Sequence, residues 1–288
     1  MRREYVLLSI LILLASCVHS SGTRNNHSHE ENQLTSENTI TIIGEPNTDS
    51  DDRHSSKSTT ESICSIVQPS PLSHHYEQII KRKAFIVSYN KETRCPNWVA
   101  WHLTAEHTDG NVPRYNDYLE DEDVPKPRAT NDDYRGSGWS RGHMCPAGDN
   151  KWDEEAMRET FLLTNMCPQN RELNSGLWNR IEQDCRQWAR AFGELFIVCG
   201  PVLLNRQHET IGTNRVVVPE AFFKVILCLQ GTPKAIGFIV RNNEGKKKRD
   251  QFINSVDEVE RITGYDFFPS LPDSIENVVE DHADIEDW

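Results

Sequence analysis

The chain has 288 residues with 31 Lys and Arg against 44 Asp and Glu, so its formal net charge is −13. This acidic balance argues against a partner made of phosphates, because a basic surface is the usual footprint of nucleic-acid binding. Hydrophobic residues make up 36% of the chain, which predicts that part of it is unfolded. No apolar run after residue 20 approaches the roughly 20 residues that span a bilayer, so the sequence excludes a multi-span membrane protein.

The excess acid is concentrated at the two ends of the chain. Residues 18–70 carry 3 basic and 8 acidic side chains, and residues 273–288 carry 7 acidic side chains and no basic one. Residues 71–272 carry 26 basic and 28 acidic side chains and are close to neutral. The net charge therefore does not exclude a phosphate substrate for this central segment.

The first 17 residues have the outline of an export signal. A basic start precedes an apolar stretch from Tyr5 to Ala15, which is too short for a comfortable transmembrane helix. The exit Leu14-Ala15-Ser16-Cys17 resembles the lipobox of bacterial lipoproteins, in which the cysteine becomes the first mature residue and carries a lipid. The alternative is an ordinary secretory signal cleaved near Ser20. We therefore expect an exported protein, either a bacterial cell-envelope lipoprotein held to the membrane through Cys17 or a secreted protein.

The rest of the chain divides into three segments. Residues 18–70 are rich in Ser, Thr, Asn, His and acid and are expected to form a disordered polar tether, because they cannot bury enough apolar surface to offset chain entropy. Residues 71–272 are numerous enough for one well-packed domain. Residues 273–288 show no clear helical or strand periodicity and are expected to form a loosely held acidic tail.

The apolar pattern of residues 71–272 predicts five strands and three helices. The strands, bounded by Pro, Gly and Asn, cover 84–89, 98–103, 195–199, 222–229 and 235–240. The helices, with apolar residues at spacings of three and four, cover 154–163, 177–192 and 256–262. Asp153 and Ser255 are the expected N-caps of the first and last helix. Since strands and helices do not alternate strictly, we expect an α+β fold with a central, largely antiparallel sheet flanked by helices.

Two segments carry residues of a candidate catalytic site. Arg141-Gly142-His143 lies in the first, from Trp139 to Ala147, and Asn165, Asn174, Glu182 and Arg186 lie in the second, from Leu163 onward. Glu182 and Arg186 are four residues apart in a predicted helix, so they share a face. Asn174 is expected at the start of that helix, where its side-chain oxygen can face a neighbouring site.

These residue types match the needs of phosphodiester hydrolysis. A water must lose a proton near neutral pH, which suits His143, because a free histidine has a pKa of about 6.5. Charge on the phosphate and the leaving oxygen must be offset by a metal and by an arginine such as Arg141 or Arg186. Magnesium accepts one or two protein oxygens and keeps several waters, so Asn174 would be a direct ligand and Glu182 would hold a metal-bound water.

At these residues the chain resembles the DNA/RNA non-specific endonuclease family, a ββα-metal (His-Me finger) group that includes secreted bacterial nucleases and mitochondrial endonuclease G. The similarity extends from about Tyr76 to Pro272. Ser140 stands where the commonest family motif has Asp. The matching segments are Arg141-Gly142-His143, Thr164-Asn165-Met166-Cys167-Pro168-Gln169, Leu173-Asn174-Ser175-Gly176-Leu177-Trp178 and Ile181-Glu182.

The resemblance implies a ββα-metal nuclease domain over residues 71–272 that hydrolyses DNA and RNA without sequence preference, with Mg²⁺ or Mn²⁺ as cofactor. The implied roles are His143 as general base, Asn174 as metal ligand, Glu182 as holder of a metal-bound water, Asn165 as the residue that orients the site, and Arg141 and Arg186 as phosphate-facing residues. The alternative is a catalytically weak or inactive nucleic-acid-binding module on the same fold, anchored at the envelope.

Three further features carry expectations of their own. Cys145 and Cys167 hold matching places in the two motifs, so we expect them near one another, either as a disulfide or as two free thiols. The run from Lys246 to Arg249 favours a solvated hairpin tip over a phosphate contact. The run from Glu120 to Asp123 lacks the glycine and spacing of an EF-hand and predicts a solvated acidic loop.

Overall fold

The computed structural model describes residues 66–73 and 75–288. The predicted signal at 1–17, with its lipobox-like end at Cys17, and most of the predicted tether at 18–70 lie outside these residues. Among the described helices, none combines the length and the apolar character that a membrane crossing requires.

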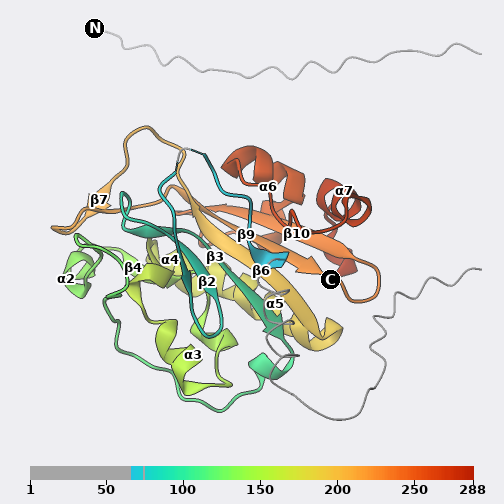
Figure 1. The fold of residues 1–288 in the computed structure, drawn as a ribbon, viewed down its shortest axis with the longest axis horizontal. Helices are drawn as coiled ribbons and strands as arrows, with labels where there is room; N and C mark the ends of the chain where they lie inside the picture. Colours follow the sequence, from blue (N-terminus) through green and yellow to red (C-terminus); the bar gives the residue numbers. More distant parts are fainter. Residues whose placement is uncertain (1–65, 74) are drawn as a thin grey trace, which may run out of the picture. The chain divides into compact units, whose positions relative to one another are not determined.

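A seven-stranded sheet lies at the centre of the fold (Figure 1), and every neighbouring pair of its strands is antiparallel. The predicted α+β fold with a central antiparallel sheet is therefore confirmed. The five predicted strands are the long ones, and the pattern missed the short edge strands. In spatial order the strands are β1 (Gln78–Lys81), β2 (Ile86–Asn90), β3 (Cys95–Thr104), β6 (Glu194–Val202), β9 (Ala221–Cys228), β10 (Lys234–Arg241) and β11 (Ile253–Asn254).

Both faces of the sheet are covered by helices, which explains why its central strands are almost entirely apolar. Side chains alternate between the faces, so Phe222 and Ile226 of β9 pack with α5 on one side, while Phe223 and Val225 pack with α6 and α7 on the other. The helices are α2 (Asn131–Tyr134), α3 (Glu154–Glu159), α4 (Arg171–Leu173), α5 (Asn179–Phe192), α6 (Val256–Thr263) and α7 (Asp273–Asp281).

The three predicted helices and both predicted N-caps are present. Asp153 accepts hydrogen bonds from the backbone of Glu155 and Ala156, and Ser255 accepts one from Glu258. The first helix is shorter than predicted, because α3 ends at Glu159. The chain then extends so that Leu119 pairs with the backbone of Phe161 and Leu163, and this non-local pairing competes with further helical turns.

A small ββα unit lies against one face of the large sheet. β4 (Ser140–His143) and β5 (Met166–Gln169) pair antiparallel, with Arg141 opposite Pro168 and His143 opposite Met166. The chain then passes through α4 and a π-helical turn, Asn174–Trp178, into α5. This unit brings the two sequence motifs side by side.

Both proposed boundaries of the domain need correction. The folded part begins before residue 71, because Val67 is buried and Ser70 donates a hydrogen bond to the Asp266 carboxylate. The expected loose tail at 273–288 is wrong, because Asp273–Asp281 forms α7 and buries Val279. Trp288 packs on Trp188 with ring centroids 4.8 Å apart. Although the segment is acidic, its apolar side chains Val279 and Trp288 pack against the sheet and α5 respectively.

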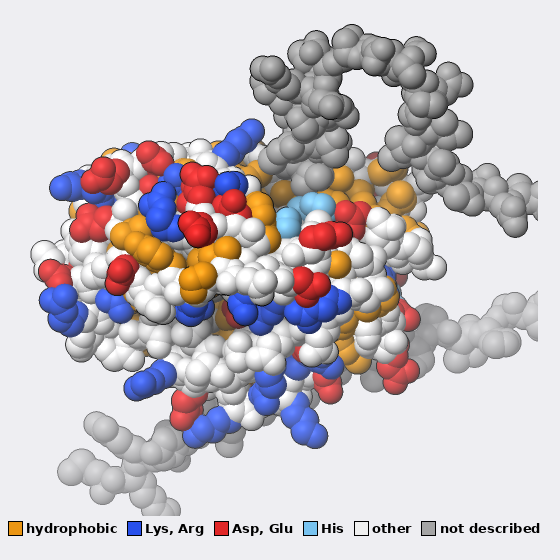
Figure 2. Space-filling view, turned by 90° about the horizontal axis from the view of Figure 1, so that it is seen from below, with side chains coloured by type: hydrophobic (Ala, Val, Ile, Leu, Met, Phe, Trp, Pro, Cys, Tyr) orange, Lys and Arg blue, Asp and Glu red, His pale blue; other side chains and the backbone are white. Residues whose placement is uncertain are grey.

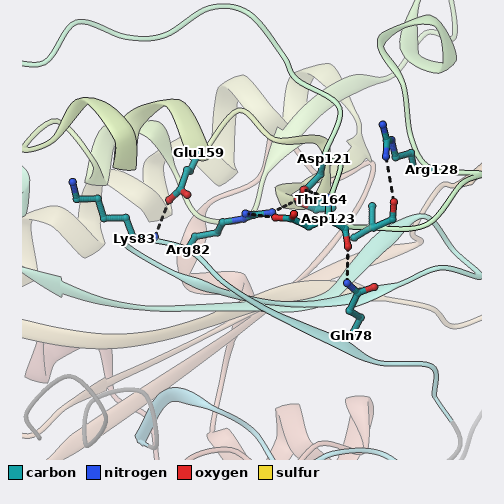
Figure 3. Close-up of polar contacts among 9 residues, drawn as sticks. Gln78, Arg82, Lys83, Asp121, Asp123, Arg128, Glu159 and Thr164 are labelled. Carbon is teal, nitrogen blue, oxygen red and sulfur yellow. Dashed lines mark hydrogen bonds and ion pairs between the residues drawn. The ribbon is translucent and has the colours of Figure 1, made fainter. Parts of the chain in front are cut away.

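The expectation of a solvated acidic loop at Glu120–Asp123 holds for the exposed Glu120, Glu122 and Asp123, but it is wrong for Asp121. Asp121 is buried, bonds Arg82 at 2.5 Å and accepts a 2.6 Å hydrogen bond from Thr164 Oγ1 (Figure 3). Asp123 bonds the same guanidinium at 2.8 Å (Figure 3). Glu120 bonds Arg128 at 3.2 Å. These ion pairs tie the loop to β1 and to the turn that leads into β5.

Candidate active site

A pocket of about 290 Å³ opens where β4 meets the π-helical turn and the start of α5. Five of the six site residues predicted from the sequence line it, and Asn165 does not. The lining residues are Arg114, Tyr118, Arg141, His143, Pro146, Ala147, Gly148, Asn174, Ser175, Asn179, Glu182 and Arg186.

His143 is the last residue of β4, and its imidazole lies in an aromatic corner of the pocket. The ring meets Phe161 edge to face at 4.9 Å and lies 6.1 Å from the ring of Tyr118. Its Nε2 has no hydrogen-bond partner among the described residues. Burial, with a smaller contribution from Arg114, lowers the pKa of His143 to about 3. The imidazole is therefore neutral at pH 7 and able to accept a proton.

Gly142 and Asn165 shape the strand that carries His143. A Cβ on Gly142 would lie 2.3 Å from Gln169 Oε1, so β5 can approach β4 here only because residue 142 is glycine. Asn165 is fully buried and brackets the peptide of Cys145, accepting from its N–H at 2.9 Å and donating to its carbonyl at 2.9 Å. Asn165 thus touches the backbone beyond His143 and makes no wall of the pocket.

Asn174 does not lie at the start of the helix, as predicted, but one turn inside a longer helical run. Asn170 is the true N-cap, because its side chain accepts hydrogen bonds from the backbone of Glu172 and Leu173. The turn from Asn174 to Trp178 is π-helical, and such turns are frequent at functional sites. The Asn174 side chain lines the pocket and makes no hydrogen bond with another described residue.

Glu182 faces the same pocket from the first turn of α5. Its carboxylate forms no ion pair or hydrogen bond with another described residue. Burial raises the pKa of Glu182 to about 7, although Lys224 and Arg186 act in the opposite direction. An amide oxygen and a carboxylate without protein partners are the donor types that a hard divalent cation takes, with water completing its shell.

Three guanidinium groups surround the pocket. Arg141 stacks between the rings of Tyr118 and Tyr134 at 4.9 and 5.1 Å, and donates to the Asn131 carbonyl at 3.0 Å. Arg186, four residues after Glu182, donates to the Asp149 carboxylate at 2.7 Å. Arg114, which the sequence analysis did not single out, lies over Phe161.

Two buried charged residues behind the pocket, Lys224 and Asp149, were not predicted as site residues. Lys224 is fully buried, with Nζ 4.8 and 4.9 Å from the ring centroids of Trp101 and Trp178. Burial alone would lower the pKa of Lys224, but nearby thiols and the carboxyls of Glu182 and Asp149 raise it overall. A lysine within the apolar run Ala221–Cys228 is a sequence signal for such a buried charge. Asp149 carries no comparable signal, since its partners are distant in sequence.

The thiols and the basic run have plain structural roles. Cys145 and Cys167 are buried free thiols, so the expected alternative of a disulfide between them is excluded. In the basic run, Lys246 pairs with Glu172 at 3.2 Å and Arg249 pairs with Asp184 at 2.8 Å. The favoured reading of a surface turn is consistent with these exposed, largely neutralised charges.

Figure 2 shows one face on which Lys and Arg side chains lie interspersed with Asp and Glu side chains. Affinity for a polyanion would therefore depend on a few placed cations around the pocket rather than on net charge.

The model of a known family matches residues 66–274, which is most of the chain; that family is described as DNA/RNA non-specific endonuclease. The chain belongs to this family. The match begins at residue 66, the first of the described residues, and it ends inside α7.

Curated relatives in several organisms share this region. The mitochondrial nuclease EXOG of Xenopus laevis is 40% identical over 202 residues, which are 64% of this chain and 56% of that protein. The mitochondrial endonuclease G of Homo sapiens is 32% identical over 209 residues, 67% of this chain and 70% of that protein. Nuclease C1 of Cunninghamella echinulata var. echinulata is 35% identical over 67% of this chain and 83% of its own length. The chain thus spans little more than half the length of EXOG.

Among solved structures, the crystal structure of the EndoG/EndoGI complex contains a similar chain. It superposes with a TM-score of 0.66 and 29% identity, covering 69% of this chain and 89% of that one. The fold is therefore the ββα-metal nuclease fold that the motifs implied.

Proposed function

We propose that this protein is a metal-dependent endonuclease that hydrolyses phosphodiester bonds in DNA and RNA without sequence preference. Family membership supports the reaction class. The observation that carries the proposal is the convergence of His143, Asn174 and Glu182, with three arginines, on one pocket. A neutral base beside unpaired oxygen donors and cationic groups suits hydrolysis of a polyanion.

His143 acts in this proposal as the general base that takes a proton from the attacking water. Its low pKa keeps the imidazole neutral at pH 7. Its Nε2 forms no hydrogen bond with another described residue, so this nitrogen is free to accept a proton from water. Asn165 positions the strand end that carries it through the Cys145 peptide. Arg141, Arg114 and Arg186 hold and neutralise the phosphate.

Asn174 and Glu182 are the residues that would hold the metal, with Asn174 as direct ligand and Glu182 acting through a bound water. Their oxygen chemistry favours Mg²⁺, with Mn²⁺ as the next candidate. The ion would supply Lewis-acid stabilisation of charge on the phosphate and the leaving oxygen. Within the described residues, no group of three His, Cys, Asp or Glu donors gathers in this pocket, so a zinc site of the thiolate or imidazole kind is not proposed.

Cleavage of plasmid DNA and of RNA by the purified chain in the presence of magnesium tests this proposal. We expect His143→Ala to lower the cleavage rate by about 10² or more, because general base catalysis contributes rate factors of this size. His282→Ala is the matched control, since His282 is exposed and lies outside the pocket. Full activity of His143→Ala would contradict the mechanism. Binding of nucleic acid without metal-dependent cleavage would instead support the non-catalytic alternative.

We also propose that the chain is exported and carries a lipid on Cys17. The support is the sequence pattern alone, a basic start, a short apolar core and Leu14-Ala15-Ser16-Cys17. Labelling with an alkyne-bearing fatty acid in a bacterial host should mark the protein, and Cys17→Ser should remove the label. An unlabelled protein recovered from the medium would favour the simple secretory signal.

A further inference from the structure

A cluster of carboxylates lies between α6 and α7, on the face of the sheet opposite the pocket. Asp257 and Glu260 project from α6, and Glu280 projects from α7, which lies beside α6 in Figure 1. Ligand oxygens of the three side chains all lie within 4.8 Å of one another. Three carboxylates this close repel one another strongly unless something compensates their charge.

Glu280 is an unusual member of this cluster because it is buried. It is 7% exposed, and its Oε1 has no hydrogen-bond partner in the described part of the chain. A buried carboxylate oxygen without a partner is costly, and it marks a place where a proton or a cation would be stabilised.

Within residues 66–73 and 75–288, no basic side chain compensates the cluster. Among the described residues, Asp257, Glu260 and Glu280 form no ion pair, and the contact found for Glu260 is a 2.7 Å hydrogen bond from the Phe267 N–H. The other charged groups that act on Glu280 are Glu276 and Asp266, which are acidic as well. This mutual repulsion, added to burial, raises the pKa of Glu260 to about 7 and that of Glu280 to about 8.

We propose that Asp257, Glu260 and Glu280 bind a calcium ion that fastens α7 to α6. The donors are all carboxylate oxygens, which selects a hard cation over zinc or copper. Three oxygens within 4.8 Å of one another can share one divalent cation. Calcium takes oxygens at about 2.3–2.6 Å in flexible geometry, whereas magnesium demands a near-ideal octahedron at about 2.0–2.1 Å, so calcium requires less rearrangement of side chains held on two helices. Calcium also accepts irregular coordination in which water completes the shell.

The site would serve stability and would be separate from the catalytic pocket. α7 packs on the sheet chiefly through Val279, next to Glu280. A cation at this point replaces repulsion between the two helices with attraction to a shared charge. Metal chelation would then loosen the C-terminal helix as well as remove the catalytic ion.

Thermal unfolding of the full chain, stripped of metal and then given millimolar calcium or magnesium, tests the site. Calcium should raise the Tm by about 5 °C at concentrations well above its Kd, and magnesium should raise it less. Above about pH 8, where Glu280 is ionised, Glu280→Gln should raise the Tm of the metal-free protein, because a repelling charge is gone, and it should remove most of the calcium-induced rise. Its nuclease activity in magnesium should equal that of the wild type.

Glu258→Gln is the matched control, because Glu258 lies on the same helix but pairs with Arg261 at 2.6 Å. It should keep the full response to calcium. If Glu280→Gln folds poorly, the exposed Asp257→Asn gives the same test of the calcium response. A calcium-induced rise that both cluster variants retain would place the ion elsewhere and overturn the proposal. So would a wild-type protein that calcium does not stabilise.

Discussion

Lys224 is a residue whose burial links the large sheet to the candidate active site. Its ammonium group lies between two tryptophan rings, with no exposure to solvent. Its positive charge lowers the pKa of Glu182, opposing the burial that raises it. Lys224 does not line the pocket, so we regard it as a positioning residue that keeps Glu182 ionised.

Replacing Lys224 with Met should therefore change the pH dependence of the reaction. Without the lysine charge the pKa of Glu182 rises above about 7, so a larger fraction of Glu182 is protonated at neutral pH. We expect kcat/KM at pH 7 to fall about tenfold and the acidic limb of the pH–rate profile to move up by about one pH unit. A pH series of cleavage rates at saturating metal measures both effects.

Lys81→Met provides the comparison, because Lys81 is an exposed residue of the edge strand β1. Its pH profile should match that of the wild type. A Lys224→Met enzyme with a reduced rate but an unshifted profile would indicate a packing defect, and it would contradict the electrostatic role.

The residues that could be predicted from the sequence are those carried by short motifs. His143, Arg141, Asn174, Glu182 and Arg186 were all placed in one pocket by pattern and helical spacing, and the structure brings them together. Residues such as Arg114 and Tyr118 could not be found this way, because only the tertiary fold brings them to the pocket and no local pattern marks them. Asn165 lies in a motif, but its hydrogen bonds show that it supports the site from behind.

At the scale of elements, prediction succeeded where a segment buries its own periodic apolar face. β3, β6, β9 and β10 are long buried strands, and α5 is strongly amphipathic, so their local patterns already reflect their environment. β4 and β5 have four residues each, and they exist because they pair with one another. A stretch of this length carries too little local pattern to predict a strand.

Composition is a poor guide to structure where an acidic segment folds through a few apolar side chains at regular spacing. The segment 273–288 holds 7 acidic residues, yet Ile275 and Val279 lie four residues apart and face the sheet from α7. Such i, i+4 spacing is the signature of one helix face. In the same way, the acidic run at Glu120–Asp123 forms specific ion pairs that its composition did not suggest.

At the scale of the whole molecule, charge is arranged differently on the two faces of the sheet. The pocket face carries Lys224 and three arginines beside its carboxylates. On the opposite face, the Glu280 carboxyl lies among other acidic groups that raise its pKa, namely Glu260, Glu276, Asp257 and Asp266. In the absence of divalent cations, the stability of the folded state should therefore depend on pH through Glu260 and Glu280 on this face, together with Glu182 in the pocket.

Metal-free protein should become more stable as the pH falls from about 8 to about 6. The folded-state pKa values of Glu280 and Glu260 are about 8 and about 7, above the ordinary value of 4.5. The folded state therefore binds more protons than the unfolded state in this range, and the free energy of unfolding rises as protons are added. Each such carboxyl contributes at most about 1.4 kcal/mol per pH unit. Below about pH 6, buried His143, whose pKa is lowered, acts in the opposite direction.

Urea unfolding in EDTA at a series of pH values measures this dependence. The Glu280→Gln variant should show a flatter curve, because the carboxyl with the most strongly raised pKa, Glu280, is gone while Glu260 and Glu182 remain. With calcium present the wild-type dependence should reverse, since protons and calcium compete for the same oxygens and calcium binds the ionised forms. Metal-free stability that instead climbs from pH 6 to pH 8 would mean that the α6–α7 carboxylates are compensated by something other than protons or a cation.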